Sequence, residues 1–180
     1  MPESGETVRT FVAVLLSEAA AREAERLLDR LRPLARCRWV TRAQLHITLR
    51  FLGELPPAAV ERVRSAVAAV AVQPFDIELH RAGAFPDLAR PRTLWLGGDR
   101  GASELTALAG RVNDALFGVG IPRDDRPFSP HLTLARSDGS PLPPALMREL
   151  ERVPSVAWRC SDISLMRSRL TPRGAVYTRL

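Results

Sequence analysis

LHITLRFLG, from Leu45 to Gly53, determines how this sequence is interpreted, because a similar segment, HLTLARS, occurs from His131 to Ser137. Both segments contain His-x-Thr-Leu, and the chain of 180 residues has only three histidines. Both also show the alternation of polar and apolar residues that is typical of a half-buried strand. Because alternate side chains of a strand share a face, each segment would place one imidazole and one hydroxyl on its polar face.

If these two strands face each other across a cleft, two imidazoles and two hydroxyls meet there with approximate two-fold symmetry. Histidine titrates near neutral pH, so a pair can supply one acid and one base together. Hydroxyls suit the non-bridging oxygens of a phosphate. His46 and Thr48, with His131 and Thr133, therefore predict a site that cleaves a phosphoester without a metal. His80 has no threonine two residues later and is expected to be structural or exposed.

The segments around the two motifs alternate between strands and helices. Strands are expected at 10–16, 37–40, 45–52, 75–85, 92–98, 131–136, 158–170 and 175–180, and helices at 17–31, 57–70, 103–116 and 143–153. Pairs of adjacent strands between helices favour antiparallel or mixed α+β sheets over a doubly wound parallel sheet. The length suits one well-buried core, so residues 1–180 are expected to form a single domain.

The charge of the chain allows two explanations. The formal net charge is +6, and all 26 basic residues are arginine. An excess of positive charge favours an anionic partner such as a nucleic acid. The complete absence of lysine is also typical of a GC-rich coding bias, and the arginines are spread along the whole chain.

Nothing in the sequence suggests a membrane or secreted protein. Residues 1–11, MPESGETVRTF, lack a basic start followed by an apolar stretch. The longest apolar runs are far too short to cross a bilayer. Cys37 and Cys160 form no CxxC pair. We therefore expect a cytoplasmic protein with no membrane partner.

The chain resembles the two-histidine phosphoesterase superfamily, and within it the RNA 2′,3′-cyclic phosphodiesterases, historically called 2′-5′ RNA ligases. The segments that carry the resemblance are, in order, RWVTRAQLHITLRFLGE, RTLWLG, RPFSPHLTLAR and SRLTPRGAVYTRL. It implies a bilobal α+β fold, with two antiparallel sheets flanked by helices around a pseudo-two-fold central cleft. It also implies a monomer that hydrolyses RNA 2′,3′-cyclic phosphate ends to 2′-phosphates, with no cofactor and no metal. Some members join tRNA halves through a 2′-5′ bond, so tRNA fragments are candidate partners.

The resemblance also implies individual roles for the site residues. His46 matches the proton donor at O3′, and His131 matches the proton acceptor for water. Thr48 and Thr133 match the hydroxyls that hold the phosphate. Arg136 matches the family arginine that lies five residues after the second histidine.

Strand parity raises a question about the positions that follow each histidine. An odd offset puts Arg136 on the face away from His131, unless a strand end, a bulge or a long reaching side chain brings it back. Phe51 has the same offset after His46 and is either a platform for base stacking or an ordinary core residue. Arg50 shares the parity of His46 and is expected to be either a charge at the cleft or a solvated strand arginine.

Three other functions remain open from the sequence. A relative of the same superfamily could act on a small cyclic nucleotide, and only the RNA-subfamily segments quoted above argue against it. A metallohydrolase would use both histidines as ligands, but the sequence lacks H-E-x-x-H spacing and a clear set of carboxylate partners. A non-catalytic module that binds RNA ends would not need both His-x-Thr pairs intact.

Overall fold

The computed structural model describes residues 7–180, which contain ten strands, four α-helices and two short 3-10 helices, Arg32–Leu34 and Arg42–Gln44. Residues 1–11, from which the sequence analysis excluded a signal peptide, lie partly outside the described residues. The helices are α1 (Glu18–Leu31), α2 (Pro57–Ala68), α3 (Ala102–Phe117) and α4 (Pro144–Leu150). The strands are β1 (Val8–Leu15), β2 (Arg38–Trp39), β3 (His46–Leu55), β4 (Phe75–Leu79), β5 (Arg81–Phe85), β6 (Thr93–Gly97), β7 (Leu132–Arg136), β8 (Val156–Cys160), β9 (Ser164–Thr171) and β10 (Gly174–Arg179). Within residues 7–180, no helix has the length and apolar character needed to cross a membrane.

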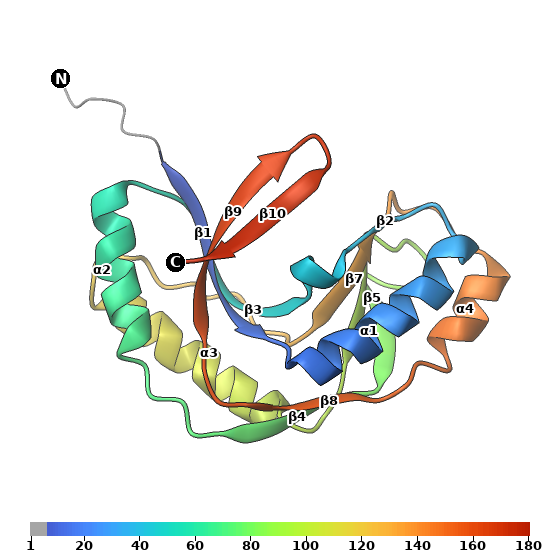
Figure 1. The fold of residues 1–180 in the computed structure, drawn as a ribbon, viewed down its shortest axis with the longest axis horizontal. Helices are drawn as coiled ribbons and strands as arrows, with labels where there is room; N and C mark the ends of the chain where they lie inside the picture. Colours follow the sequence, from blue (N-terminus) through green and yellow to red (C-terminus); the bar gives the residue numbers. More distant parts are fainter. Residues whose placement is uncertain (1–6) are drawn as a thin grey trace.

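Eight strands form one antiparallel sheet in the order β10-β9-β1-β3-β7-β6-β5, with β2 pairing to β7 off this path. A second antiparallel sheet contains β4 and β8. The α+β class with two antiparallel sheets is therefore confirmed. Helices α2 and α3 lie toward one end of the molecule and α1 and α4 toward the other (Figure 1).

The larger sheet has two halves of four strands that meet where β3 pairs with β7. The register of that contact contains one pair, Ile47 opposite Leu132. Both His-x-Thr strands belong to this sheet, so the expectation that they face each other from opposite walls of a cleft is wrong. They are neighbours, and the two-fold relation of the halves is that of an antiparallel strand pair.

Two of the predicted strands are each divided in two. The strand predicted at 75–85 becomes β4 and β5 with a break at His80, and the one at 158–170 becomes β8 and β9. β4 and β8 pair with each other, whereas β5 and β9 belong to the larger sheet. A strand of either sheet needs alternating apolar residues. The alternation therefore does not indicate where the chain passes from one sheet to the other.

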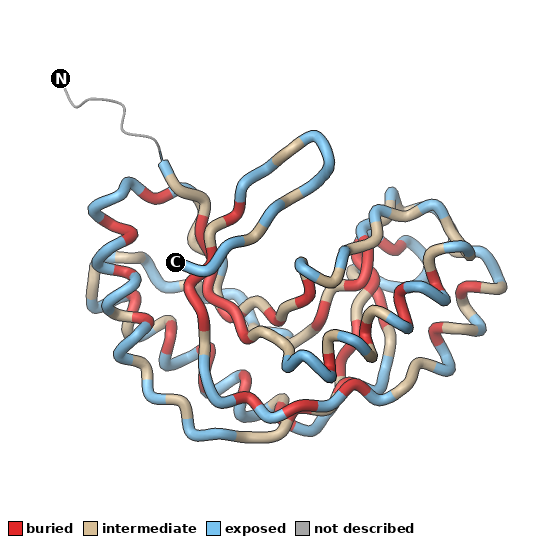
Figure 2. The backbone as a smooth tube through the Cα atoms, viewed as in Figure 1, coloured by how far each residue is buried: buried red, intermediate tan, exposed pale blue. Residues whose placement is uncertain are grey.

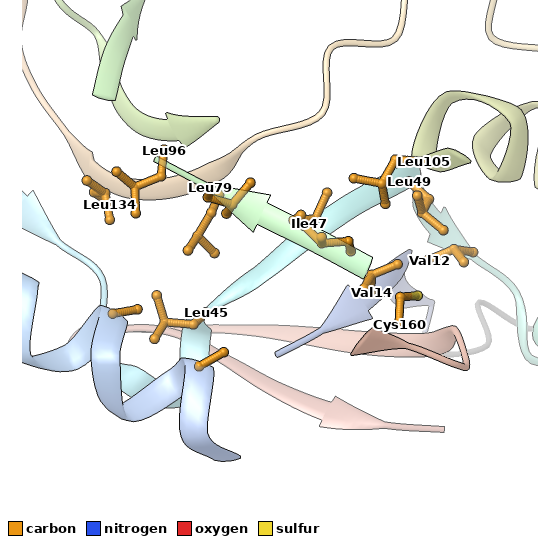
Figure 3. Close-up of a cluster of buried hydrophobic side chains, with 14 of the residues drawn as sticks. Val12, Val14, Leu45, Ile47, Leu49, Leu79, Leu96, Leu105, Leu134 and Cys160 are labelled. Carbon is orange, nitrogen blue, oxygen red and sulfur yellow. The ribbon is translucent and has the colours of Figure 1, made fainter. Parts of the chain in front are cut away.

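Buried side chains from both halves form one apolar cluster. Figure 3 shows Leu96 and Leu134 in the same close-up as Val12, Ile47 and Leu105. The helix α1 contributes one buried stripe, which consists of Ala20, Ala24, Leu27, Leu28 and Leu31. Buried residues follow the strands and the inner sides of the helices, while the turn of the β9–β10 hairpin is exposed (Figure 2).

One β-bulge in each half lies at a matching place, and the β1–β3 pairing has a further irregularity at Leu52. Leu49 of β3 has no partner, because the residues on either side of it are opposite consecutive residues of β1. Leu134 of β7 has no partner in β6 for the same reason. Each unpaired leucine lies three residues after the histidine of its motif, and a bulge reverses the alternation of faces beyond it.

The junction between the halves should contribute strongly to stability. Leu132 is 0% exposed, so Leu132→Ala removes buried apolar atoms and leaves a cavity. We expect the free energy of unfolding to fall by about 2–5 kcal/mol, measured by urea denaturation followed by circular dichroism. Leu170→Ala is the matched control, because Leu170 is 69% exposed on β9, and its effect should stay within about 0.5 kcal/mol. Equal losses in the two variants would contradict this role of the junction.

Candidate active site

The contact between β3 and β7 places the two His-x-Thr motifs beside each other. Continuing its register by one residue on either side of the central pair puts His46 opposite Thr133 and Thr48 opposite His131. Directly opposite side chains share a face, so all four project from the same side of the sheet. The two histidines are diagonal neighbours, which in an antiparallel pair are roughly 7–8 Å apart. That separation leaves room for one phosphate group between the imidazoles.

A backbone carbonyl two residues before each histidine orients its ring. Nδ1 of His46 lies 2.7 Å from the carbonyl oxygen of Gln44, and Nδ1 of His131 lies 2.8 Å from that of Ser129. A carbonyl oxygen only accepts hydrogen bonds, so Nδ1 carries a proton in both rings. Nε2 is therefore the nitrogen that each ring offers for chemistry.

The two Nε2 atoms have different neighbours. Nε2 of His46 lies 2.9 Å from Oγ1 of Thr48. In the neutral ring this nitrogen is an acceptor, so the threonine hydroxyl donates to it. Nε2 of His131 has no hydrogen-bond partner within residues 7–180. The second imidazole thus presents an open lone pair, while the first is engaged by its own threonine.

Aromatic side chains cover both imidazoles. The ring of His46 lies 4.8 Å from Phe11 and 5.2 Å from Tyr177, measured between centroids. The ring of His131 lies 4.9 Å from Phe85, edge to face. Burial disfavours the charged imidazolium and lowers the pKa of both histidines, although their hydrogen bonds to backbone carbonyls partly oppose this. Both rings are therefore mainly neutral near pH 7 in the absence of an anion.

Gln44 ties His46 to the C-terminal hairpin. Besides the carbonyl that orients the imidazole, its side-chain amide donates to the carbonyl oxygen of Ala175 in β10 at 2.7 Å. Its Oε1 accepts from the backbone N–H of Thr41 at 2.9 Å. Tyr177, on the same strand β10, supplies one of the rings that cover His46.

The bulge in β7 brings Arg136 to the histidine face. Leu134 and Ala135 are both buried, although they are consecutive, and Arg136 after them is exposed. The bulge is therefore the device that reverses the parity of this position. The guanidinium donates to Oγ1 of Thr93 at 2.8 Å. Its positive charge also lowers the pKa of His131, so it lies within electrostatic reach of that ring.

The matching bulge in β3 determines the positions of Phe51 and Arg50. Phe51 is 43% exposed, so it is no ordinary core residue. The guanidinium of Arg9 lies 4.7 Å from the centroid of its ring and covers one face. Arg50 is turned inward: its side chain is 11% exposed and forms an ion pair with Asp124 at 3.0 Å. Arg50 also lines the hollow described below, so its charge lies at the site, but it is paired with Asp124 and is not a solvated strand arginine.

A hollow of about 480 Å³ opens beside these groups. Its lining includes Thr48, Phe51, Phe85 and His131, together with residues of α3 and of the segment 124–129. Arg9 is not part of this lining, so it covers a face of the Phe51 ring from outside the hollow. Ligand sites of this volume typically combine apolar walls with a few polar groups. The hollow suits a planar ring system whose attached group reaches the histidines.

Comparison with known proteins adds a family to this geometry. A family model described as the 2′-5′ RNA ligase superfamily matches residues 17–172. The chain belongs to this superfamily. A curated relative from Aeropyrum pernix, named RNA 2′,3′-cyclic phosphodiesterase, is 38% identical over 138 residues, which are 75% of this chain and 78% of the relative.

Two solved structures extend the likeness to the 2′-5′ RNA ligase fold as a whole. The structure of TT0787 of Thermus thermophilus is 32% identical, with a TM-score of 0.78 and coverage of 96% of this chain and 94% of that one. E. coli LigT complexed with 3′-AMP is 26% identical, with a TM-score of 0.76 and coverage of 97% and 96%.

The structure brings four of the six predicted site residues onto one face and places the other two at its border. His46, Thr48, His131 and Thr133 share one face of the β3–β7 pair, and Arg136 and Phe51 border it. His80 is exposed and lines neither of the hollows described here, as expected. No group of three or more histidine, cysteine and acidic side chains that could hold a metal ion occurs within residues 7–180.

The sequence analysis missed the groups that orient and cover the imidazoles. These are the carbonyls of Gln44 and Ser129 and the rings of Phe11, Phe85 and Tyr177. Backbone carbonyls leave no trace in a sequence, although both lie two residues before a histidine. The aromatic residues come from distant strands whose pairing the sequence does not specify.

The charge of Arg136 should be measurable at His131. In the Arg136→Gln variant, the pKa of His131 should rise, because a positive charge that disfavours the imidazolium is removed. The pKa can be followed by NMR titration of the imidazole signals. Arg148→Gln, an exposed arginine on α4, is the control and should leave the His131 midpoint where it is. A fall in the pKa of His131, or no change, would contradict the assignment.

Proposed function

We propose that this protein hydrolyses the 2′,3′-cyclic phosphate at the end of an RNA strand and leaves a 2′-phosphate. The observation that carries the proposal is the pair of Nε2 atoms on one face of the sheet, diagonally related and each fixed through Nδ1 by a carbonyl. The name of the Aeropyrum pernix relative, RNA 2′,3′-cyclic phosphodiesterase, supports this substrate class. The binding of 3′-AMP by E. coli LigT supports a nucleotide as ligand.

Opening a cyclic phosphate by water requires the entering and leaving oxygens to lie on opposite sides of phosphorus. A phosphate between the two imidazoles has one ring on each of these sides. The open lone pair on Nε2 of His131 would accept a proton from the attacking water. His46, protonated on Nε2, would donate its proton to O3′ as the bond to phosphorus breaks. His131 gains the proton of the water as His46 loses its proton to O3′, so the total charge of the two histidines does not change.

Binding of the substrate would favour the protonated form of His46, which takes up its proton from solvent. An anionic phosphate beside a buried imidazole favours the imidazolium and raises its pKa. Once protonated, Nε2 of His46 no longer accepts the hydrogen bond from Thr48. The Thr48 hydroxyl is then released to donate to a phosphate oxygen, as Thr133 would do from the other strand. Binding of the anion and preparation of the acid are thereby coupled.

Arg136 and Phe51 would hold the two ends of the terminal nucleotide. Arg136 adds a positive charge on the His131 side of the phosphate, where charge-assisted hydrogen bonds to phosphate oxygens are strong. Phe51 lines the hollow, and Arg9 covers one face of its ring, so the other face would be the one that a base can use. A nucleobase stacked there would complete a sandwich. Ligation of RNA ends through a 2′-5′ bond, including tRNA fragments, is the reverse of the same reaction and belongs to the proposal.

The histidines should be individually necessary for turnover. An oligonucleotide that ends in a 2′,3′-cyclic phosphate should be converted to a 2′-phosphate in the presence of EDTA, as identified by mass spectrometry and ³¹P NMR. His46→Ala and His131→Ala should each lower kcat by roughly 10²–10⁴, the usual effect of a positioned acid or base. His80→Ala is the control and should behave like the unmodified protein.

Two outcomes would contradict this assignment. A loss of turnover in EDTA that Zn²⁺ or Mn²⁺ restores would indicate a metallohydrolase. Full activity of both histidine variants would mean that the chemistry lies elsewhere. In the double variant, the loss should be much smaller than the product of the single losses, because the two residues act as a unit.

The division of roles between the histidines can be tested with a substrate whose O3′ is replaced by sulfur. A thiolate leaves with little protonation, so the need for an acid disappears while the need for a base remains. His46→Ala should recover much of its lost rate on this substrate, whereas His131→Ala should stay slow. Recovery of the His131 variant alone would reverse the two roles.

A further inference from the structure

A second hollow, of about 670 Å³, lies at the C-terminal end of β7, whereas His131 precedes the N-terminal end of that strand. Four arginines line it, Arg36, Arg38, Arg92 and Arg136, together with Cys37, Ser137 and Asp138. Asp138 is the one acidic residue of this lining, and no aromatic side chain contributes to it. We call it the arginine hollow. Its chemistry is that of an anion site, whereas the first hollow combines the aromatic walls of Phe51, Phe85 and Phe128 with polar and charged side chains of both signs.

The arrangement of these arginines is unfavourable without an anion. Arg38 is directly opposite Arg136 in the pairing of β2 with β7. Like charges at directly opposite positions of an antiparallel pair repel and destabilise it. Within residues 7–180, Arg36, Arg38 and Arg92 form no ion pair with a carboxylate at 4.0 Å or less. Asp138, whose pKa the charge of Arg92 helps to lower, is the one acidic group of the lining. All three arginines are exposed. An anion between them would remove the repulsion.

Arg136 is the one residue that relates the arginine hollow to the phosphate site proposed above. Its charge acts on His131 at one end, and its side chain lines the arginine hollow at the other. In the proposed complex, the terminal phosphate of the RNA lies at the histidines and its last base lies over Phe51. The nucleotides that precede the last one then need a binding site of their own. The arginine hollow offers them positive charge without a stacking surface, which suits a phosphate and not a base.

We propose that the arginine hollow binds a backbone phosphate on the 5′ side of the terminal nucleotide. This inference rests on the proposed function, because it assumes that the cyclic phosphate lies between the two histidines. Guanidinium groups bind phosphate oxygens through paired hydrogen bonds. The protein would therefore bind the end of an RNA strand in preference to a single nucleotide. That preference would separate it from an enzyme for small cyclic nucleotides.

The test compares two substrates with the same last nucleoside: a mononucleoside 2′,3′-cyclic phosphate and a tetranucleotide that ends in one. The variant combines Arg36→Ala, Arg38→Ala and Arg92→Ala. The ratio of kcat/KM for the tetranucleotide to that for the mononucleotide should exceed tenfold in the unmodified protein and fall to near one in the variant. The loss should appear in KM for the tetranucleotide, because the hollow binds substrate and transition state alike.

A charge-matched control combines Arg62→Ala, Arg148→Ala and Arg152→Ala. These three arginines are exposed and line neither hollow. The control should keep the substrate ratio of the unmodified protein. For the tetranucleotide, the dependence of log(kcat/KM) on log salt should become shallower in the first variant, by about 0.7 for each phosphate that is no longer bound. Its midpoint of thermal unfolding should stay the same or rise, because repelling charges are removed.

The outcomes separate this inference from the proposed function. If neither substrate is hydrolysed by the unmodified protein, the proposed function fails. If both are hydrolysed and the arginine variant keeps its substrate ratio, only the arginine hollow is refuted. An equal fall for both substrates, or an equal effect of the control, would mean that general electrostatic attraction and not a specific subsite is responsible.

Discussion

The antiparallel contact between β3 and β7 is the constraint on which the rest of the site depends. An antiparallel strand pair has a two-fold axis of its own, so the same short motif on both strands produces a two-fold arrangement of side chains. Ile47 and Leu132 are both 0% exposed at that axis. A slip of one residue would bury the imidazoles and expose these side chains, so the apolar pair fixes the register. The chemistry is positioned by two residues that take no part in it.

The bulges then give the two sides of this symmetric backbone different properties. At the same offset from its histidine, one half carries an aromatic ring and the other a guanidinium. The first lines a hollow with aromatic and mixed polar walls, and the second lines a hollow that has four arginines. A nucleotide has the same polarity, with a planar base at one side and a charged backbone at the other. Two equal halves thus form a site that distinguishes the two ends of its ligand.

The sequence predicted those features of the fold that depend on local pattern. The helix predicted at 17–31 is α1, whose cap at Ser17 accepts a hydrogen bond from the backbone N–H of Ala20 and whose apolar stripe is buried. The His-x-Thr repeat identified the four polar side chains that the structure brings together. The pairing of distant strands could not be predicted, because alternation shows which face is buried and not which strand lies next. The burial of Arg50 depends on Asp124, far along the chain. For the same reason, the partners of the imidazole rings escaped the sequence analysis.

The link from Gln44 to β10 has a consequence for how this chain can be altered at its end. Tyr177 and Ala175 lie within the last six residues, and both act on the segment that holds His46. In most domains a terminus tolerates extension, trimming and fusion, because few contacts depend on it. Here the final strand is part of the wall around a reactive imidazole. Removal of β10 would therefore strip His46 of a covering ring and leave the side-chain amide of Gln44 without its acceptor.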